Sequence, residues 1–374
     1  MDYTIYSSSR ASVIYWLRPQ RGLYLGASEG VFLAKANNSY EALTPDNISI
    51  TNIIAGAVSP MQPITVGNVT LYADEFKRRL QEIKYSFQED AFDNPDTALL
   101  AEHCTKGLLN QVASAPYPNY LIWITDLNGN LFSLTYLPKQ NITAWARHEL
   151  GGGGVVESLL TVPGPNETEV WMIVKRTING SVKRYIECFS PAFMDQDITD
   201  ATFLDSYISY DGSPVTSFSG LGHLEGKTVG CFGDGANVVV TGTGAVSGGS
   251  INLQTDVSKA IVGLPYESEI ETNQLTSSSA PASLQGRLGR IQGAVLRLYR
   301  SYGGEIGISD SKMDIMPEYG VQTVMDGPLT LYSGDREFVI PSEYNLNPNM
   351  TIRHTLPVPF NLVSIVLKAS VSAR

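Results

Sequence analysis

The sequence predicts an all-β protein in which a partial β-propeller is followed by small β-barrel or β-sandwich domains. Only 17% of the residues are charged and 43% are hydrophobic, which is typical of a globular chain with a sizeable core. The 34 glycines and 20 prolines supply many sharp turns, and short apolar runs alternate with these turns. Because single cores seldom grow beyond about 300 residues, a chain of 374 residues predicts two or three domains.

The propeller prediction depends on a repeated unit of two apolar strands around a polar turn. The four copies lie within residues 23–33, 64–87, 121–136 and 170–188. The last two contain Asn128-Gly129 and Asn179-Gly180, the dipeptide that two-residue hairpin turns favour. The units start near residues 23, 69, 121 and 170, at spacings of 46, 52 and 49 residues, as four-stranded propeller blades do. We therefore assign 1–192 to blades. Unrelated meanders with accidental spacing are the alternative.

The rest of the chain divides by composition. Inside the repeats, residues 95–107 predict a short helix that ends at Gly107. Residues 193–216 are acidic and Ser-rich, which predicts a linker. The Gly- and Val-rich segment 217–284 predicts a small β-domain, and 285–374 predicts a C-terminal β-domain. In that last domain we expect the two strands within 352–367 to return to the sheet formed by 285–300.

Bulk charge and cysteine content restrict the function classes. A net charge of −11 argues against a protein that wraps nucleic acid. No apolar run is long enough to span a bilayer, and the start lacks signal-peptide character, so we expect a protein made and kept in a reducing cytoplasm. Cys104, Cys188 and Cys231 are far apart, which predicts three buried thiols and neither disulfides nor a metal site.

Several segments resemble one family, the tail nozzle proteins of podoviruses, also called tail tubular protein B. The most specific block runs from residue 220 to 266 and includes the segments 220–229, 248–253 and 262–266. Further matches lie at 21–30, 63–67, 99–103 and 184–191, and at Trp171 with Lys175-Arg176. The resemblance covers most of the chain.

This resemblance implies a propeller with β-rich platform domains, assembled as a homohexameric ring at the distal end of a bacteriophage tail. It implies an adapter ring and tail fibres as partners, passage of genomic DNA during ejection, and a place in the virion after assembly in the host cytoplasm. Family members are usually longer at the N-terminus. We therefore expect a separate chain or another ring protein to supply the missing blades.

Residues with catalytic or metal-binding potential form no recognisable constellation. The four histidines, 103, 148, 223 and 354, are scattered, and we expect structural roles for them. Gly151–Gly154 lacks the Lys-Ser/Thr of a phosphate loop, so a flexible loop is expected there. Asp211-Gly212 and the Asp-Gly pair at 234–235 suit tight turns without calcium. We accordingly expect no enzyme, no metal and no cofactor.

Two sets of residues are singled out for structural or assembly roles. Gly220, His223, Glu225 and Gly226 predict a turn motif in which the polar side chains bond to backbone, with a tuned His–Glu pair as the alternative. Arg287, Arg290, Arg297 and Arg300 form a cationic strand in an acidic protein, which predicts an interface between ring subunits. A solvated strand face and contact with passing DNA are alternatives for the arginines.

The sequence thus favours a ring-forming tail nozzle or tail-hub protein without catalysis. Two other function classes remain open. Propeller loops suit glycans, and Trp123, Trp145 and Trp171 could stack on sugars, which would make the chain a host-recognition module. A hydrolase of cell wall or capsule is the third class, and no motif supports it.

Overall fold

The computed structural model describes residues 12–20, 22–38, 41–193, 195–275, 287–309, 312–316 and 327–372. Within these residues, the all-β prediction is confirmed: antiparallel strands dominate, and the one α-helix, α1 (Glu102–Thr105), has four residues. The chain forms two compact units. The first holds most of the residues up to Pro191, and the second holds Ala192–Arg374 together with the short segments Leu150–Gly153 and Thr177–Val182. No helix of the described residues is long and apolar enough to cross a membrane.

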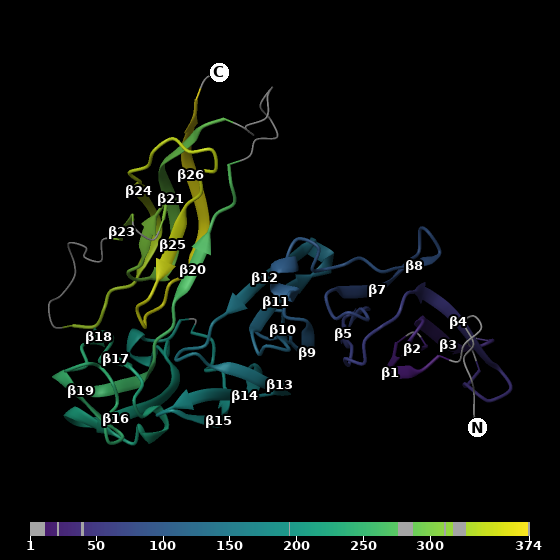
Figure 1. The fold of residues 1–374 in the computed structure, drawn as a ribbon, viewed down its shortest axis with the longest axis horizontal. Helices are drawn as coiled ribbons and strands as arrows, with labels where there is room; N and C mark the ends of the chain where they lie inside the picture. Colours follow the sequence, from purple (N-terminus) through teal and green to yellow (C-terminus); the bar gives the residue numbers. More distant parts are fainter. Residues whose placement is uncertain are drawn as a thin grey trace. The chain divides into compact units, whose positions relative to one another are not determined.

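Four antiparallel meanders make up the first unit, each with its strands in chain order (Figure 1). The first sheet contains β1 (Ile14–Pro19), β2 (Leu23–Ala27), β3 (Gly30–Ala36) and β4 (Ile48–Ala55). The second contains β5 (Ile64–Val66), β6 (Val69–Ala73), β7 (Leu80–Ser86) and β8 (Ala91–Asp93). The third contains β9 (Leu109–Ala115), β10 (Leu121–Asp126), β11 (Leu131–Leu137) and β12 (Ile142–His148). The fourth contains β13 (Val155–Pro163), β14 (Thr168–Ile178) and β15 (Ser181–Cys188). The predicted hairpins are β2–β3, β6–β7, β10–β11 and β14–β15.

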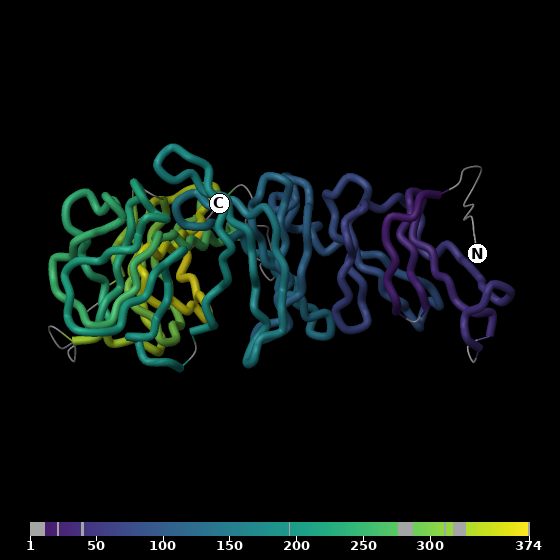
Figure 2. Tube along the Cα trace, turned by 90° about the horizontal axis from the view of Figure 1, so that it is seen from below, coloured from purple at the N-terminus to yellow at the C-terminus, as the bar shows by residue number. Residues whose placement is uncertain are grey.

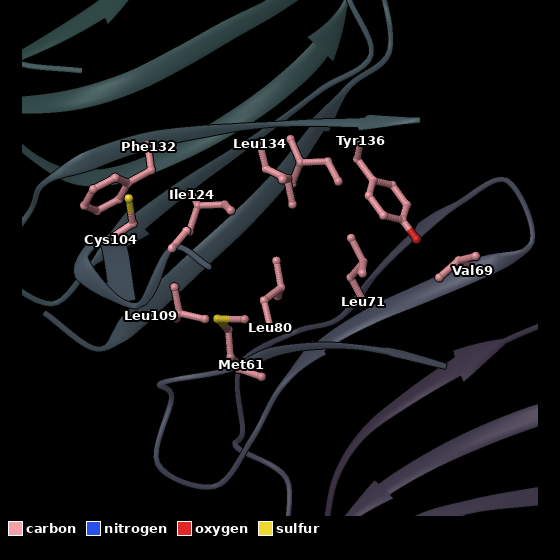
Figure 3. Packing of buried hydrophobic residues seen from close by; sticks show 13 residues of the cluster. Met61, Val69, Leu71, Leu80, Cys104, Leu109, Ile124, Phe132, Leu134 and Tyr136 are labelled. Carbon is pink, nitrogen blue, oxygen red and sulfur yellow. The ribbon is translucent and has the colours of Figure 1, made fainter. Parts of the chain in front are cut away.

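The first three sheets pack face to face in succession, so their central strands are apolar on both sides. Strand β6 is buried at every position, and β10 at every position but the first. The second and third sheets share one core, in which Val69 and Leu71 face Leu134 and Tyr136 (Figure 3). The first and second sheets share another, built around Trp16, whose ring lies 6.0 Å from that of Tyr72. The tube in Figure 2, purple to blue here, shows these meanders following one another.

The predicted helix over 95–107 is much shorter than expected, because only α1 is helical. Its Cys104 is buried in the core that the second and third sheets share. The chain then turns at Gly107, where a Cβ atom would lie 1.8 Å from Oδ2 of Asp126. Glycine is therefore required at this position by close approach of a neighbouring strand.

Three sheets make up the second unit. One has the order β16-β19-β17-β18 and contains β16 (Asp205–Ser219), β17 (Gly230–Gly233), β18 (Ala236–Val238) and β19 (Ser250–Leu264). Another has the order β20-β25-β22-β23 and contains β20 (Ser268–Glu271), β22 (Glu305–Gly307), β23 (Met313–Ile315) and β25 (Thr351–His354). The last has the order β24-β21-β26 and contains β21 (Gly289–Ser301), β24 (Tyr332–Val339) and β26 (Leu362–Val371). The last two share a core that includes Leu296, Ile306 and Ile352, as in a sandwich.

The structure corrects three predictions about this half. The prediction of a linker over 193–216 is wrong, because β16 starts at Asp205 and pairs with β19 along its length. Strand β20 lies within the predicted domain 217–284, yet it pairs with β25 of the C-terminal segment. Of the two C-terminal strands, β26 pairs with β21 as expected, whereas β25 belongs to the facing sheet. Residues 276–286, between the two predicted domains, lie outside the described residues.

The cysteine prediction holds for two of the three thiols. Cys104 and Cys231 are buried, and burial raises the pKa of Cys231 to about 12. Cys188 is exposed, so its predicted burial is wrong. It ends β15, on a face of the fourth sheet whose side chains are exposed.

Candidate functional site

The predicted turn motif joins two loops of the second unit. Gly220 and Gly226 have φ of +90° and +75°, the left-handed region that glycine adopts without strain. Between them, Nε2 of His223 lies 2.9 Å from the carbonyl oxygen of Ser206. The two oxygens of Glu225 accept hydrogen bonds from the backbone N–H groups of Gly248, at 2.9 Å, and Gly249, at 2.7 Å.

We call the loop 220–226, together with the loop at Gly248 and Gly249, the paired-loop motif. Apolar neighbours anchor it in the core of the β16–β19 sheet. Leu221 and Leu224 have no exposed surface, and Leu221 donates its N–H to the carbonyl oxygen of Gly249 at 2.9 Å. The carboxylate of Glu225 thus satisfies two backbone donors, and His223 bonds the backbone of strand β16. Both polar side chains bond backbone groups, which is the use expected of a turn motif and differs from that of an acid–base pair.

The four predicted interface arginines do not form one cationic patch. Arg297, exposed on β21, donates two hydrogen bonds to Asp335 of β24, each of 2.7 Å, and these bonds lower the pKa of Asp335. Arg300 lies 3.5 Å from Asp195, and its guanidinium stands 5.3 Å from the ring centre of Phe193. Arg297 and Arg300 therefore have carboxylate partners within their own unit, as the solvated strand face would predict.

Arg287 and Arg290 differ from that pair. Each is half-buried, and each has a buried Nε without a hydrogen-bond partner among the described residues. Because these Nε atoms are buried within the chain, a carboxylate of another subunit cannot reach them. The interface prediction therefore stays a prediction for all four arginines.

Arg176, one of the residues that carry the resemblance, is buried on the inner side of β14. Its side chain has no exposed surface and forms an ion pair with Glu187 of β15. Removal of one partner of a buried ion pair is costly, because the other charge remains desolvated. This pair ties β14 to β15 and has a structural role.

The tryptophans that a glycan site would need are mostly in the core. Trp123 is 7% exposed, with the rings of His148 and Phe189 centred 4.8 and 4.6 Å from its own. Trp145 is half-buried and donates its indole N–H to the carbonyl oxygen of Thr97 at 2.9 Å. Trp171, 37% exposed, is the most accessible of the three. Of these three side chains, Trp171 is therefore the one that could stack on a sugar, and host recognition stays an alternative.

The glycine-rich candidates for phosphate or metal binding are used within the chain. The N–H of Gly151 donates to Oδ2 of Asp205 at 2.7 Å, and Gly151 packs against the backbone of Leu264. Asp234 accepts hydrogen bonds from the N–H groups of Ser258, at 2.9 Å, and Lys259, at 2.8 Å. Among the described residues, no group of three or more His, Cys, Asp or Glu side chains could hold a metal ion.

The structure also presents a surface that the sequence analysis missed. Strand β14 alternates buried and exposed residues, and its exposed positions are apolar in the middle of the strand. We call the exposed side of β13, β14 and β15 the outer face of the fourth sheet. Its apolar members, with their exposed fractions, are Leu160 (53%), Val162 (39%), Trp171 (37%), Ile173 (39%) and Ile186 (75%).

Register places these side chains together. Leu160 pairs with Trp171 across β13 and β14. The N–H of Phe189 donates to the carbonyl oxygen of Val170, and counting back along the two antiparallel strands places Ile186 opposite Ile173. The signal in the sequence was the unbroken apolar run 170–174, which is typical of a strand covered on both faces.

Comparisons with known proteins do not identify a family for the chain. No protein-family model and no curated protein matches it. Among solved structures it is similar to an exo-β-1,3-galactanase from Phanerochaete chrysosporium, crystallised with β-1,3-galactotriose, at 12% identity over 92% of this chain and 78% of that chain. The TM-score is 0.26, which is too low to support an assignment of fold or function.

Proposed function

We propose that the chain is a structural protein of a bacteriophage virion, a ring-forming component of the tail nozzle or tail hub that acts without catalysis. Its partners are further copies of itself in a hexameric ring, an adapter ring above it and tail fibres around it. Genomic DNA passes through the ring during ejection. This proposal rests on the resemblance to podovirus tail nozzle proteins. The structural role of the residues that carry the resemblance supports it.

One observation carries the proposal. The residues on which the family resemblance depends most use their side chains to hold loops and strands of the chain together. In the block 220–266, Glu225 bonds Gly248 and Gly249, and His223 bonds Ser206. Outside the block, Arg176 pairs with Glu187 in the interior of the fourth sheet. Hydrogen bonds and an ion pair that hold loops and strands together are expected of a protein whose function depends on its shape, since a catalyst would direct such groups into a cavity.

Charge is consistent with a conduit. The net charge of −11 repels the phosphate backbone, so DNA would pass without adhering. Arg287, Arg290, Arg297 and Arg300 are the residues that we assign to contacts between ring subunits.

The direct test is mass spectrometry of gradient-purified, salt-washed virus particles. We expect several copies of the chain per particle, in the proportion of a ring, and image reconstruction of the tail should contain its density. Absence of the chain from washed particles would contradict the proposal. Binding of host polysaccharide by the purified chain, lost when Trp171 is changed to Ala, would instead favour the host-recognition class.

A further inference from the structure

The outer face of the fourth sheet lacks the cover that the other sheets of the first unit have. The middle strands of those sheets, such as β6 and β10, are buried on both sides. Strand β14 has the same apolar composition, but Trp171 and Ile173 remain exposed at 37% and 39%. Beside them, Ile186 is 75% exposed. Contiguous apolar side chains on one sheet face are typical of an interaction surface.

Charged side chains border this apolar centre, and their signs differ at its two ends. At one end, Arg184 donates to Glu157 at 2.6 Å, and Nζ of Lys175 lies 3.6 Å from the same carboxylate. Two cations share one carboxylate there, so this end is net positive. A polar rim around an apolar centre is the usual composition of a protein–protein interface.

The opposite end is acidic. Glu169 accepts the indole N–H of Trp171 at 2.9 Å. Glu169 pairs with Val162 where β13 ends, and Glu167 directly precedes β14, so both carboxylates belong to this end of the sheet. After burial, their charges are a further cause of the raised pKa of Cys188. The face is therefore polarised along its strands, from Glu167 and Glu169 at one end to Lys175 and Arg184 at the other.

We propose that a second copy of this chain packs on the outer face of the fourth sheet, with the two β14 strands antiparallel across a two-fold axis. In this arrangement, the basic end of each copy lies over the acidic end of its partner. Ile173 and Ile186 lie near the axis and pack against their counterparts, as the inner faces of a β-sandwich do. The same surface serves both copies, as in most symmetric dimers.

The charges select this orientation over the alternative. With the strands parallel, Glu167 and Glu169 would meet the same residues of the partner, and like charges at close range oppose association. The inference stands apart from the proposed function. A two-fold pair does not close a ring, so this contact would be additional to the ring contacts and can fail without affecting them.

The first test is the mass of the full chain in solution, measured by sedimentation at micromolar concentration. We expect a dimer for the wild type and a monomer for Ile186→Glu, because a carboxylate cannot be buried unpaired in the apolar centre. Val339→Glu is the matched control: Val339 is 79% exposed on β24, and this variant should remain a dimer. Thermal melting establishes that each variant is folded. A monomeric wild type, or a dimer that survives Ile186→Glu, would overturn the proposal.

Charge reversal tests the pairing of opposite charges across the interface. One variant combines Lys175→Glu with Arg184→Glu, so both ends of its face are acidic, and a second combines Glu167→Lys with Glu169→Lys, so both ends are basic. Each alone should self-associate at least about tenfold more weakly than the wild type. An equimolar mixture should form dimers again, which loss of folding could not produce. If the mixture stays monomeric while the wild type dimerises, pairing of opposite charges across the interface is wrong. A third variant that combines all four substitutions exchanges the two ends of the face. In the antiparallel arrangement this variant should dimerise with itself but not with the wild type, and dimers between the two would show that the strands are parallel.

Discussion

His148 is a titratable residue whose protonation opposes the packing around it. The half-buried ring lies against Trp123, and Nε2 is 2.7 Å from Oγ of Ser133. Burial lowers the pKa of His148 from 6.5 to about 4. The unfolded chain therefore takes up a proton near pH 6.5, whereas the folded chain does so only near pH 4. Stability contributed by neutral His148 is complete above pH 6.5 and is lost as the pH falls toward 4.

We expect this loss to be about 2 kcal/mol after allowance for the partial exposure of the ring. His148→Gln keeps a polar partner for Ser133 but cannot titrate in this range. Urea unfolding at pH 7, 5 and 4, followed by tryptophan fluorescence, should show a smaller pH dependence for this variant than for the wild type. His354→Gln is the control, because His354 is in the second unit and all four tryptophans, including Trp123, are in the first. Equal pH dependence in the wild type and His148→Gln would contradict the prediction.

The burial of individual residues was the property that the sequence predicted least well. Trp171 and Cys188 are apolar residues in strand patterns, which predicts burial, yet they lie on a sheet face that the chain leaves exposed. Alternation shows which residues share a face, but it does not show whether another sheet covers that face. The Arg176–Glu187 ion pair could not be predicted from the sequence either, because its partners lie on different strands.

At the scale of elements, the paired-loop motif depends on the two hydrogen bonds that Glu225 accepts. Glu225→Ala leaves the N–H groups of Gly248 and Gly249 without their acceptor, which should cost about 2 kcal/mol. Amide hydrogen exchange at both glycines should accelerate in this variant. Asp256→Ala is the control, because Asp256 is exposed on β19 of the same sheet. Unchanged protection of Gly248 and Gly249 would show that the carboxylate does not hold the loops.

Elements were predictable where turn chemistry and apolar strands coincide. Asn128-Gly129 lies in the turn between β10 and β11, and Asn179-Gly180 in the turn between β14 and β15, so these hairpins follow from the sequence alone. The flanking strands β9 and β12 are more polar and were not recognised. Strand β16 was taken for a linker because its Ser and Asp residues suit loops, yet its pairing with β19 supplies the backbone hydrogen bonds that override this preference.

For the whole molecule, the two compact units predict two unfolding transitions. The first unit contains the cores around Leu134 and Trp16, and the second contains those around Val262 and Leu296. Both Leu134 and Leu296 have no exposed surface, and a buried Leu→Ala change costs roughly 2–5 kcal/mol. Because every tryptophan lies in the first unit, fluorescence follows that unit alone, whereas far-ultraviolet circular dichroism follows both.

Leu134→Ala should therefore lower the denaturant midpoint seen by fluorescence, and Leu296→Ala should leave it unchanged. Circular dichroism follows both units, so it should detect the destabilisation in each variant. In Leu296→Ala, the transition of the second unit should move while that of the first unit stays in place. The two variants are matched in chemistry and burial, so each serves as the control for the other. A single transition that both substitutions move equally would mean that the units unfold together, since stability is then shared across the whole chain.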